Sequence, residues 1–376
     1  MNSSLSSCSR SLTRALNTNA AQSQLSSKKL GQLNRTARAL VFPGQGSQFI
    51  GMGKTLADNF QVSKLVFEEA DNALNFKLSE LIFNGNYNDL SNTENAQPAI
   101  VAVGIAAVRA IEYQTGYKIK DLCSYVLGHS IGEYTALVSS GSLSLEDGKL
   151  RGEEMKKSVD GIDVSMVAIV QRSSTIKDIA ISIKNINDKI AQSVSNNDGI
   201  FKKNDIVQIA TVNTDSQFTL SGTRSAVEYA IEFLNEKFNA VRAVSLPVSV
   251  PFHCDLMIPA ADKLKPIFNN INFKPLEIPL VSNFTGLPVE SHLDIPQLLV
   301  HQTYSQVKWY DSLKWLSSNC GIQRWLCPGP SPVISNIIRK SFPDAIVRQA
   351  ETTQNILDFA NVIKLQDNKH AKLSAL

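Results

Sequence analysis

A serine between two glycines is the clearest candidate for a reactive side chain. The stretch VLGHSIGEYTAL (126–137) places Ser130 between Gly128 and Gly132, with apolar runs on both sides. On a tight strand-to-helix turn a serine hydroxyl stands exposed above the sheet, and the crowded turn admits only tiny side chains two positions away. The pattern predicts a nucleophile at Ser130, with the amide of Ile131 aimed at an oxyanion. The alternative is a glycine-rich turn whose serine only caps a helix.

A nucleophilic serine needs a base, and the chain has five histidines. His129 adjoins the serine, but an elbow turn would send its side chain in another direction. His370 lies in the C-terminal tail. His253 follows a β-like run, in VSVPFHCDLM (248–257), where Pro251 and the preceding Pro247 fix a loop. Because loops at strand ends often carry functional groups, the pattern favours His253 over His301.

Two further features could contribute to such a site. The loop PGQGSQ (43–48) has glycines on both sides of Gln45, so its backbone amide could form the second half of an oxyanion hole. The loop lacks the lysine and the GxGxxG spacing of nucleotide-binding motifs, which disfavours nucleotide binding. Arg151 follows the serine by 21 residues. A lone arginine is usually a solvated surface residue, but one that faced the pocket could bind a carboxylate through two hydrogen bonds.

Strand-like and helix-like segments alternate around these residues. ALVFPGQGSQFIGMG (39–53) is predicted to be a short buried strand that runs into a glycine-rich loop, CSYVLGHS (123–130) a second strand, and IGEYTALVSSG (131–141) a helix. SLED (144–147) is typical of a helix N-cap and opens the helix that carries Arg151. Further helices are expected over 54–75, 97–114, 295–317 and from about 332. The alternation predicts an α/β doubly wound core with the loops at the strand ends.

The pattern of predicted elements changes between residues 163 and 248. Short β-like runs alternate there with helical stretches near 174–192 and 223–239, in the order β-α-β-β-α-β. This order predicts a small inserted ferredoxin-like subdomain. The core is then assigned to 39–162 and 249–364, and residues 365–376 are expected to form a flexible tail.

Composition restricts the classes of function. The 376 residues carry a net charge of +3, and 43% are hydrophobic. Residues 1–40 hold six basic residues and no acid, and the rest holds 31 basic and 34 acidic residues. The body therefore offers no basic field for nucleic acid. No apolar run is long enough to predict a membrane span.

The leader and the cysteines indicate a compartment. Residues 1–38 are rich in serine, bear arginine and lack acids, which is typical of an organelle transit peptide, most simply mitochondrial; a disordered polar tail is the alternative. The five cysteines are scattered without CxxC spacing or nearby histidines at metal-ligand spacing. Free thiols in a reducing compartment are expected, with no disulfide and no metal.

Several motifs together resemble one enzyme family. FPGQGSQ, GHSIGEYTAL, RGEEM, PVSVPFHCDLM and QVKW occur in the order and spacing of malonyl-CoA:acyl carrier protein transacylases, over roughly residues 40–345. The bacterial-type match with a transit-like leader resembles the mitochondrial enzyme of type II fatty acid synthesis. The resemblance implies an α/β-hydrolase-like core with a parallel sheet and a ferredoxin-like insertion.

The resemblance also implies a role for individual residues. Ser130 would take the malonyl group from coenzyme A, and His253 would act as the base. The amides of Gln45 and Ile131 would form the oxyanion hole. The remaining implied roles are malonate carboxylate binding for Arg151, a place near the pocket for Gln97, exclusion of a methylmalonyl branch for Phe252, and orientation of the histidine by the backbone carbonyl of Asn283.

The same resemblance sets the expected partners. They are malonyl-CoA, as substrate rather than cofactor, and acyl carrier protein, for a monomer in the mitochondrial matrix. No cofactor, metal, nucleic acid or membrane is expected. A serine thioesterase or hydrolase with the same elbow remains an alternative, although hydrolases usually keep their histidine near the C-terminus. A non-catalytic subunit that binds the carrier protein is the second alternative, disfavoured because the reactive residues are all retained.

Overall fold

The computed structural model describes residues 37–147, 151–159, 161–238 and 242–374. The side chains of 151–153 and 368–374 lie outside the description, as does nearly all of the predicted leader 1–38. Contacts group Arg38–Leu376 into one compact unit.

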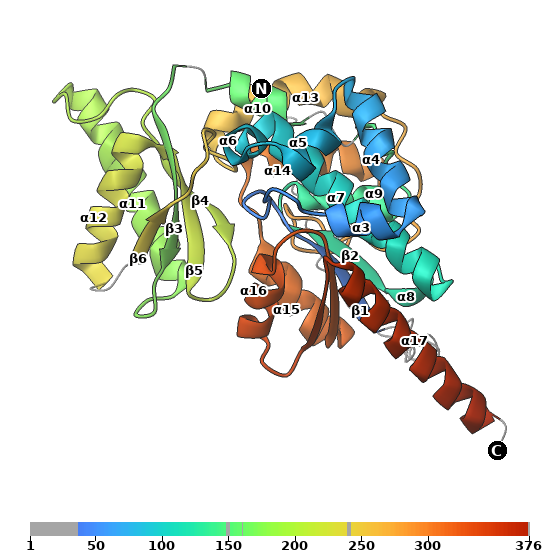
Figure 1. Cartoon of the computed structure of the whole chain (residues 1–376). Coiled ribbons are helices and arrows are strands. Elements are labelled where there is room, and N and C mark those ends of the chain that lie inside the picture. The colour runs from blue at the N-terminus through green and yellow to red at the C-terminus, as the bar shows by residue number, and fades with distance from the viewer. Residues whose placement is uncertain (1–36, 148–150, 160, 239–241, 375–376) are drawn as a thin grey trace. The chain divides into compact units, whose positions relative to one another are not determined.

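A parallel four-stranded sheet forms the centre of the larger part (Figure 1). Its strand order is β2-β1-β7-β8, and every neighbouring pair is parallel. The strands are β1 (Arg38–Phe42), β2 (Tyr125–Gly128), β7 (Arg324–Pro328) and β8 (Ile346–Ala350). β1 is buried along its whole length, as its apolar sequence predicts. The strands predicted at the start of 39–53 and within 123–130 are confirmed, and both lead into the glycine-flanked loops.

Helices cover this sheet, and one of them is almost wholly buried. α7 (Thr93–Thr115) is long and apolar enough to cross a membrane by length and composition alone, but 83% of its most apolar window is buried inside the protein. That burial is typical of the core helix of a soluble protein. The other helices of this part are α3 (Lys54–Asn59), α4 (Gln61–Leu74), α5 (Leu78–Asn84), α6 (Tyr87–Ser91), α8 (Ile119–Leu122), α9 (Gly132–Ser139), α10 (Arg151–Lys157), α13 (Ile258–Asn270), α14 (Ile295–Tyr304), α15 (Trp309–Cys320), α16 (Val333–Ser341) and α17 (Thr353–Ser374).

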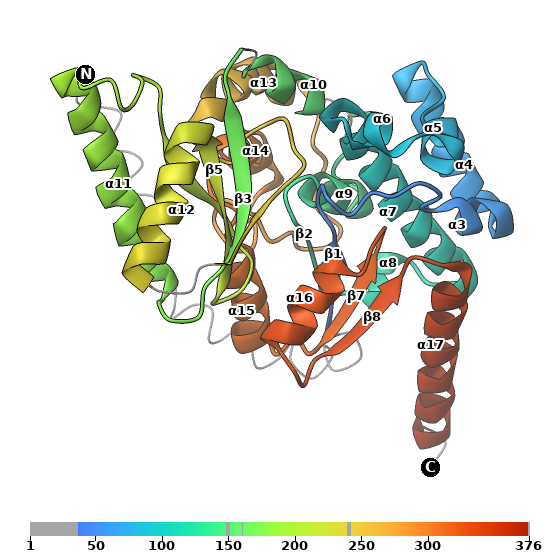
Figure 2. The ribbon, with the colours of Figure 1, turned by 60° about the vertical axis from the view of Figure 1, so that its left-hand side comes forward.

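An antiparallel sheet forms the second part, with α11 (Ile176–Asn196) and α12 (Arg224–Phe238) on one of its faces (Figures 1 and 2). Its order is β4-β5-β3-β6, from β3 (Val164–Val170), β4 (Val207–Val212), β5 (Gln217–Thr223) and β6 (Arg242–Ser245). The chain visits these elements as β-α-β-β-α-β, in the order that the sequence predicts for 163–248. A capping box at Thr175 and Asp178 begins α11.

Three predicted segments differ from the structure. The helix expected over 295–317 is two helices, because Val307 between them forms a parallel bridge with Thr211 of the antiparallel sheet. The final helix expected from 332 is interrupted by β8. The flexible tail expected from residue 365 is helical to Ser374, since no proline or glycine follows Thr353 to end α17.

Candidate active site

The turn at Ser130 joins β2 to α9 and is as crowded as its sequence predicts. A Cβ on Gly128 would lie 1.9 Å from the carbonyl oxygen of Gly132, and one on Gly132 would lie 2.6 Å from the carbonyl oxygen of Phe42. Neither position can carry a side chain. Ser130 itself has φ of +54°, in the left-handed region that L-residues rarely adopt. The glycines therefore permit the sharp elbow, and Ser130 carries its backbone strain.

His253 lies beside this serine. Its Nε2 is 2.7 Å from Ser130 Oγ, and its Nδ1 is 2.8 Å from the carbonyl oxygen of Gln302. Because a carbonyl can only accept, Nδ1 carries the proton and Nε2 is left to accept from the serine hydroxyl. The imidazole is 2% exposed. The structure thus brings together the serine and the histidine that the sequence favours.

The other two histidines considered near the site have different neighbours. Nε2 of His129 is 3.0 Å from Oδ1 of Asn213, at the end of β4. His301 stacks on Phe284, with its Nδ1 2.7 Å from the hydroxyl of Tyr304. Burial, followed by the charge of Lys265, lowers the pKa of His301. His301 is therefore engaged outside the site.

The prediction that the Asn283 carbonyl orients His253 is wrong. That carbonyl accepts from the amide of Lys308, and Gln302 supplies the carbonyl at Nδ1 instead. The side chain of Asn283 holds the elbow: Oδ1 accepts from the Ser130 amide at 2.7 Å, and Nδ2 donates to the Gly128 carbonyl at 2.7 Å. Asn283 thus supports the serine rather than the histidine.

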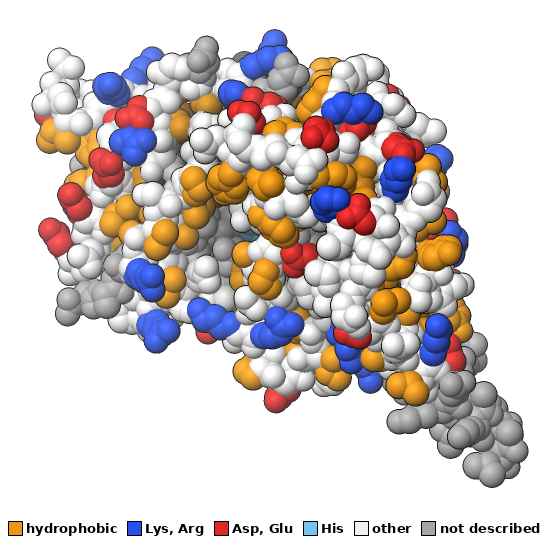
Figure 3. All heavy atoms as spheres, viewed as in Figure 1, with side chains coloured by type: hydrophobic (Ala, Val, Ile, Leu, Met, Phe, Trp, Pro, Cys, Tyr) orange, Lys and Arg blue, Asp and Glu red, His pale blue; other side chains and the backbone are white. Residues whose placement is uncertain are grey.

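A cavity of about 310 Å³ opens in front of Ser130 and His253. The two glycine-flanked loops and α16 line one side, and the uncovered face of the antiparallel sheet lines the other. The face shown in Figure 3 is hollowed between the places labelled β4 and α16 in Figure 1, with hydrophobic side chains beside the hollow. Phe252, 6% exposed, also lines the cavity, where the sequence interpretation expects it.

The amides predicted to form the oxyanion hole lie on the two loops in question. Gln45 lines the cavity beside Ser130, and Ile131 is the N-cap of α9. Within the described part of the chain, the backbone amide of neither residue donates a hydrogen bond. Their N–H groups can therefore donate to a ligand oxygen without first breaking an existing hydrogen bond.

The remaining two predicted site residues have different outcomes. Gln97 is 2% exposed and does not line the cavity; its Nε2 donates to Oε1 of Gln45 at 3.3 Å. It therefore supports the first loop from behind instead of contacting the cavity. Arg151 begins α10, but its side chain lies outside the described residues. Upstream of it, Ser144 Oγ accepts from the Asp147 amide, but α10 begins only at Arg151, so the prediction that 144–147 opens this helix is not confirmed.

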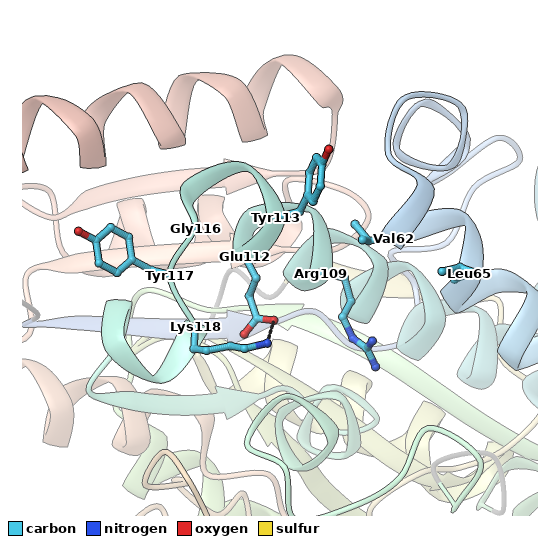
Figure 4. Close-up of a pocket in the computed structure, with 8 residues that line it drawn as sticks. All are labelled: Val62, Leu65, Arg109, Glu112, Tyr113, Gly116, Tyr117 and Lys118. Atoms are coloured by element: carbon cyan, nitrogen blue, oxygen red, sulfur yellow. Dashed lines mark hydrogen bonds and ion pairs between the residues drawn. The ribbon is translucent and has the colours of Figure 1, made fainter.

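A larger cavity, of about 450 Å³, lies between α4 and the end of α7 and contains none of the predicted site residues (Figure 4). Its Glu112 pairs with Lys118 at 3.3 Å, and Arg109 is its other charged residue. It has no nucleophile beside a base. In the described ranges, no group of three or more His, Cys, Asp or Glu side chains could hold a metal ion.

Sequence interpretation missed Gln302 and Glu133. Gln302 follows His301 near the end of α14, and no pattern in the sequence connects it with residue 253. Glu133 did carry a signal, because it is an acid within an otherwise apolar helix, and the structure leaves it only 1% exposed.

Fold and site together define an acyl transferase: the elbow serine, its histidine and two available amides lie at the carboxyl end of a parallel sheet. The acyl transferase domain model matches residues 39–314, and the chain belongs to that family. It is 37% identical over 306 residues to a malonyl CoA-acyl carrier protein transacylase of Bacillus subtilis, covering 80% of this chain and 89% of the relative.

Solved structures show the same likeness. An acyl-carrier-protein S-malonyltransferase from Bartonella henselae aligns with a TM-score of 0.78 at 35% identity, over 87% of this chain and 99% of that one. A malonyl-transacylase solved in complex with its type II polyketide acyl-carrier protein aligns with a TM-score of 0.76 at 30% identity. The alignment covers 85% of this chain and 97% of that one. The α/β fold, with one parallel and one antiparallel sheet, is thus that of these enzymes.

Proposed function

We propose that this protein transfers the malonyl group of malonyl-CoA to the phosphopantetheine thiol of acyl carrier protein, through a malonyl ester on Ser130, and so supplies fatty acid synthesis. The observation that supports this proposal most directly is the 2.7 Å contact between Ser130 Oγ and His253 Nε2. It lies at an elbow in a chain whose curated relatives bear that activity in their names.

In the first half-reaction His253 Nε2 takes the proton of Ser130 Oγ, and the oxygen attacks the thioester carbonyl carbon. The carbonyl oxygen becomes an oxyanion, for which the amides of Gln45 and Ile131 are the donors. Collapse breaks the C–S bond, and the proton on Nε2 passes to the coenzyme A thiolate. The products are free coenzyme A and the ester on Ser130.

The second half-reaction runs the same steps with the carrier thiol. His253 removes the thiol proton, the sulfur attacks the ester, and the proton returns to Ser130 Oγ. The Gln302 carbonyl keeps Nδ1 protonated throughout, so Nε2 alternates between base and acid.

Selection of the acyl group is assigned to two residues. Arg151 would bind the free carboxylate of malonate through its guanidinium fork. Phe252, on the cavity wall, would crowd a methylmalonyl branch. Gln97 serves this site indirectly, through its contact with Gln45.

The wider assignments form part of the same proposal. A transit peptide in residues 1–38 would direct a monomer to the mitochondrial matrix, supported by the acid-free leader. The enzyme would need no cofactor or metal and bind neither nucleic acid nor membrane. Its core would be a variant of the α/β-hydrolase arrangement, supported by the strand–elbow–helix at Ser130. The proposed subdomain boundaries are 163 and 248.

Intact mass spectrometry tests the function directly. The purified protein and Ser130→Ala are each mixed with malonyl-CoA, and holo-acyl carrier protein is then added. We expect a malonyl adduct on the parent alone, which discharges to the carrier. Steady release of free malonate would instead favour the hydrolase, and neither adduct nor release would leave only a binding role.

A further inference from the structure

A buried carboxylate that takes no part in the proton transfers lies directly behind the elbow. Glu133 is on the first turn of α9 and is 1% exposed. Its Oε2 accepts from Nε2 of Gln302 at 2.9 Å, and its Oε1 accepts from the backbone amide of Asn283 at 3.2 Å. A carboxylate is costly to bury unless donors compensate it, so these contacts need an explanation.

The two residues that Glu133 binds hold the backbone of Ser130, one at its N–H and the other at its carbonyl. Asn283 Oδ1 accepts from the Ser130 amide, and Gln302 Nε2 donates to the Ser130 carbonyl at 2.8 Å. Gln302 also offers its own backbone carbonyl to His253. The side-chain amide of Gln302 is therefore bonded to the nucleophile's peptide, and its main chain to the base.

The orientation of the Gln302 amide follows from its neighbours. A backbone carbonyl and a carboxylate can both only accept, so the nitrogen must face Ser130 and Glu133. The opposite orientation would place Oε1 against two acceptors. Glu133 thereby fixes which end of the amide meets the serine.

We propose that Glu133 is a positioning residue that, through Gln302 and Asn283, holds Ser130 in its strained conformation and in register with His253. The three residues form the Glu133 clamp. A strained backbone persists only where its surroundings over-determine it, and the clamp supplies that constraint at both ends of the Ser130 peptide. This inference rests on the proposed function, because its effect is read through acyl transfer.

Glu133→Gln keeps the size of the side chain but replaces one acceptor by a donor. Its NH2 must then face either the Gln302 Nε2 or the Asn283 N–H, so one contact is lost whichever way the amide turns. We expect kcat for malonyl transfer to fall roughly 10- to 100-fold, as small misplacements of reacting groups do. The KM for malonyl-CoA should stay within about threefold, because the clamp touches no substrate.

Asp71→Asn is the matched control. Asp71 is likewise a buried carboxylate, 5% exposed, and its Oδ1 accepts from the Ser79 amide at 2.8 Å. It lies in α4, outside the cavity at Ser130. We expect a lower Tm with kcat per folded molecule unchanged.

A double variant and a second single variant make the inference testable. Because Glu133→Gln and Gln302→Met break the same contact, the double variant should lose less kcat than the product of the two single losses. If Glu133→Gln does not fold, Gln302→Met can replace it, because it removes the side-chain amide and leaves the backbone carbonyl at His253. This variant should also lower kcat with little change in KM.

The outcomes are distinct. A low kcat with near-parental KM, together with a double variant that loses less than the product of the single losses, supports the clamp. A kcat per folded molecule within twofold of the parent, or single losses that multiply fully in the double variant, overturns it. If the parent itself forms no malonyl adduct, the proposed function fails instead, whatever the variants do.

Discussion

Strain at Ser130 has a cost that a substitution can release. With φ of +54°, this residue occupies a region that costs an L-residue roughly 1–2 kcal/mol, while glycine enters it freely. Ser130→Gly and Ser130→Ala both remove the hydroxyl. We expect the glycine variant to have the higher free energy of unfolding, by roughly 0.5–1 kcal/mol after its larger unfolded-state entropy is counted. Urea denaturation measures the difference.

Ser140 provides the control for this comparison. It is also buried and lies at the end of the same helix, α9, but its φ is −84°. There the order should reverse, with alanine more stable than glycine. An alanine variant at 130 as stable as the glycine variant would show that the elbow carries no strain.

Arg151 is the residue that should separate acyl groups. If its guanidinium binds the malonyl carboxylate, Arg151→Ala removes a charge-assisted pair worth about 1.5–3 kcal/mol, or roughly 10- to 150-fold in kcat/KM. Acetyl-CoA has no carboxylate, so its transfer should change far less. Equal losses with malonyl-CoA and acetyl-CoA in a steady-state assay would refute the carboxylate role.

The sequence predicts site residues where chemistry leaves a local pattern. Ser130 is found from its flanking glycines, and His253 from a proline-fixed loop after a β run. Asn283 was assigned the wrong role and Gln302 was missed, because their contacts with residues 130 and 253 span long stretches of chain. Such contacts depend on how the elements pack, and no spacing along the chain encodes them.

At the scale of elements, α14 combines a structural and a functional task. Gln302 near its end faces the site, while the preceding His301 stacks on Phe284 at 4.6 Å between ring centroids. Burial disfavours the charged imidazole and lowers the pKa of His301. The packing at the end of α14 therefore favours the neutral form of His301.

This lowered pKa predicts a pH dependence of stability. The unfolded chain binds the proton more readily than the folded one, so stability falls as pH drops below the ordinary histidine pKa of about 6.5. The loss ends once pH lies below the folded pKa. Between pH 7.5 and 5.5 the parent should lose more Tm than His301→Gln, which cannot titrate. Parallel Tm curves for the two proteins would contradict this.

Element boundaries show where local patterns stop being sufficient. The helix expected over 295–317 has helical periodicity, but a tertiary bridge at Val307 divides it. The strand β8 was missed because its residues, 346–350, follow the amphipathic α16 with only a short turn. The β-α-β-β-α-β order was predicted, because each of its elements has its own short-range pattern.

At the scale of the whole described chain, the site depends on how two sheets meet. The antiparallel sheet forms one wall of the cavity, and the two glycine-flanked loops that follow the parallel strands, together with α16, form the other. The contacts that join the two parts include the bridge between Thr211 and Val307, and the 3.0 Å contact between His129 Nε2 and Asn213 Oδ1. The second connection begins at the residue next to Ser130, so it ties the antiparallel wall directly to the elbow.

Asn213→Ala should therefore loosen the wall rather than the chemistry. With the contact to His129 lost, at a cost of about 1 kcal/mol, the antiparallel sheet can shift and hold a thioester less well. We expect the KM for malonyl-CoA to rise severalfold while kcat stays within about threefold. The contacts of Ser130 with His253, Asn283 and Gln302 do not pass through this residue.

Asn187→Ala is the comparison that isolates the sheet-to-sheet contact. The side-chain amide of Asn187 also makes hydrogen bonds, to the backbone carbonyl and from the backbone N–H of Val207. These bonds join α11 to β4 inside the antiparallel part. Its loss should lower Tm and leave KM unchanged. Steady-state kinetics at matched folded concentration would show whether only the Asn213 variant raises KM. A similar rise in both variants would mean that general softening of the antiparallel part, and not its contact with the elbow, sets substrate affinity.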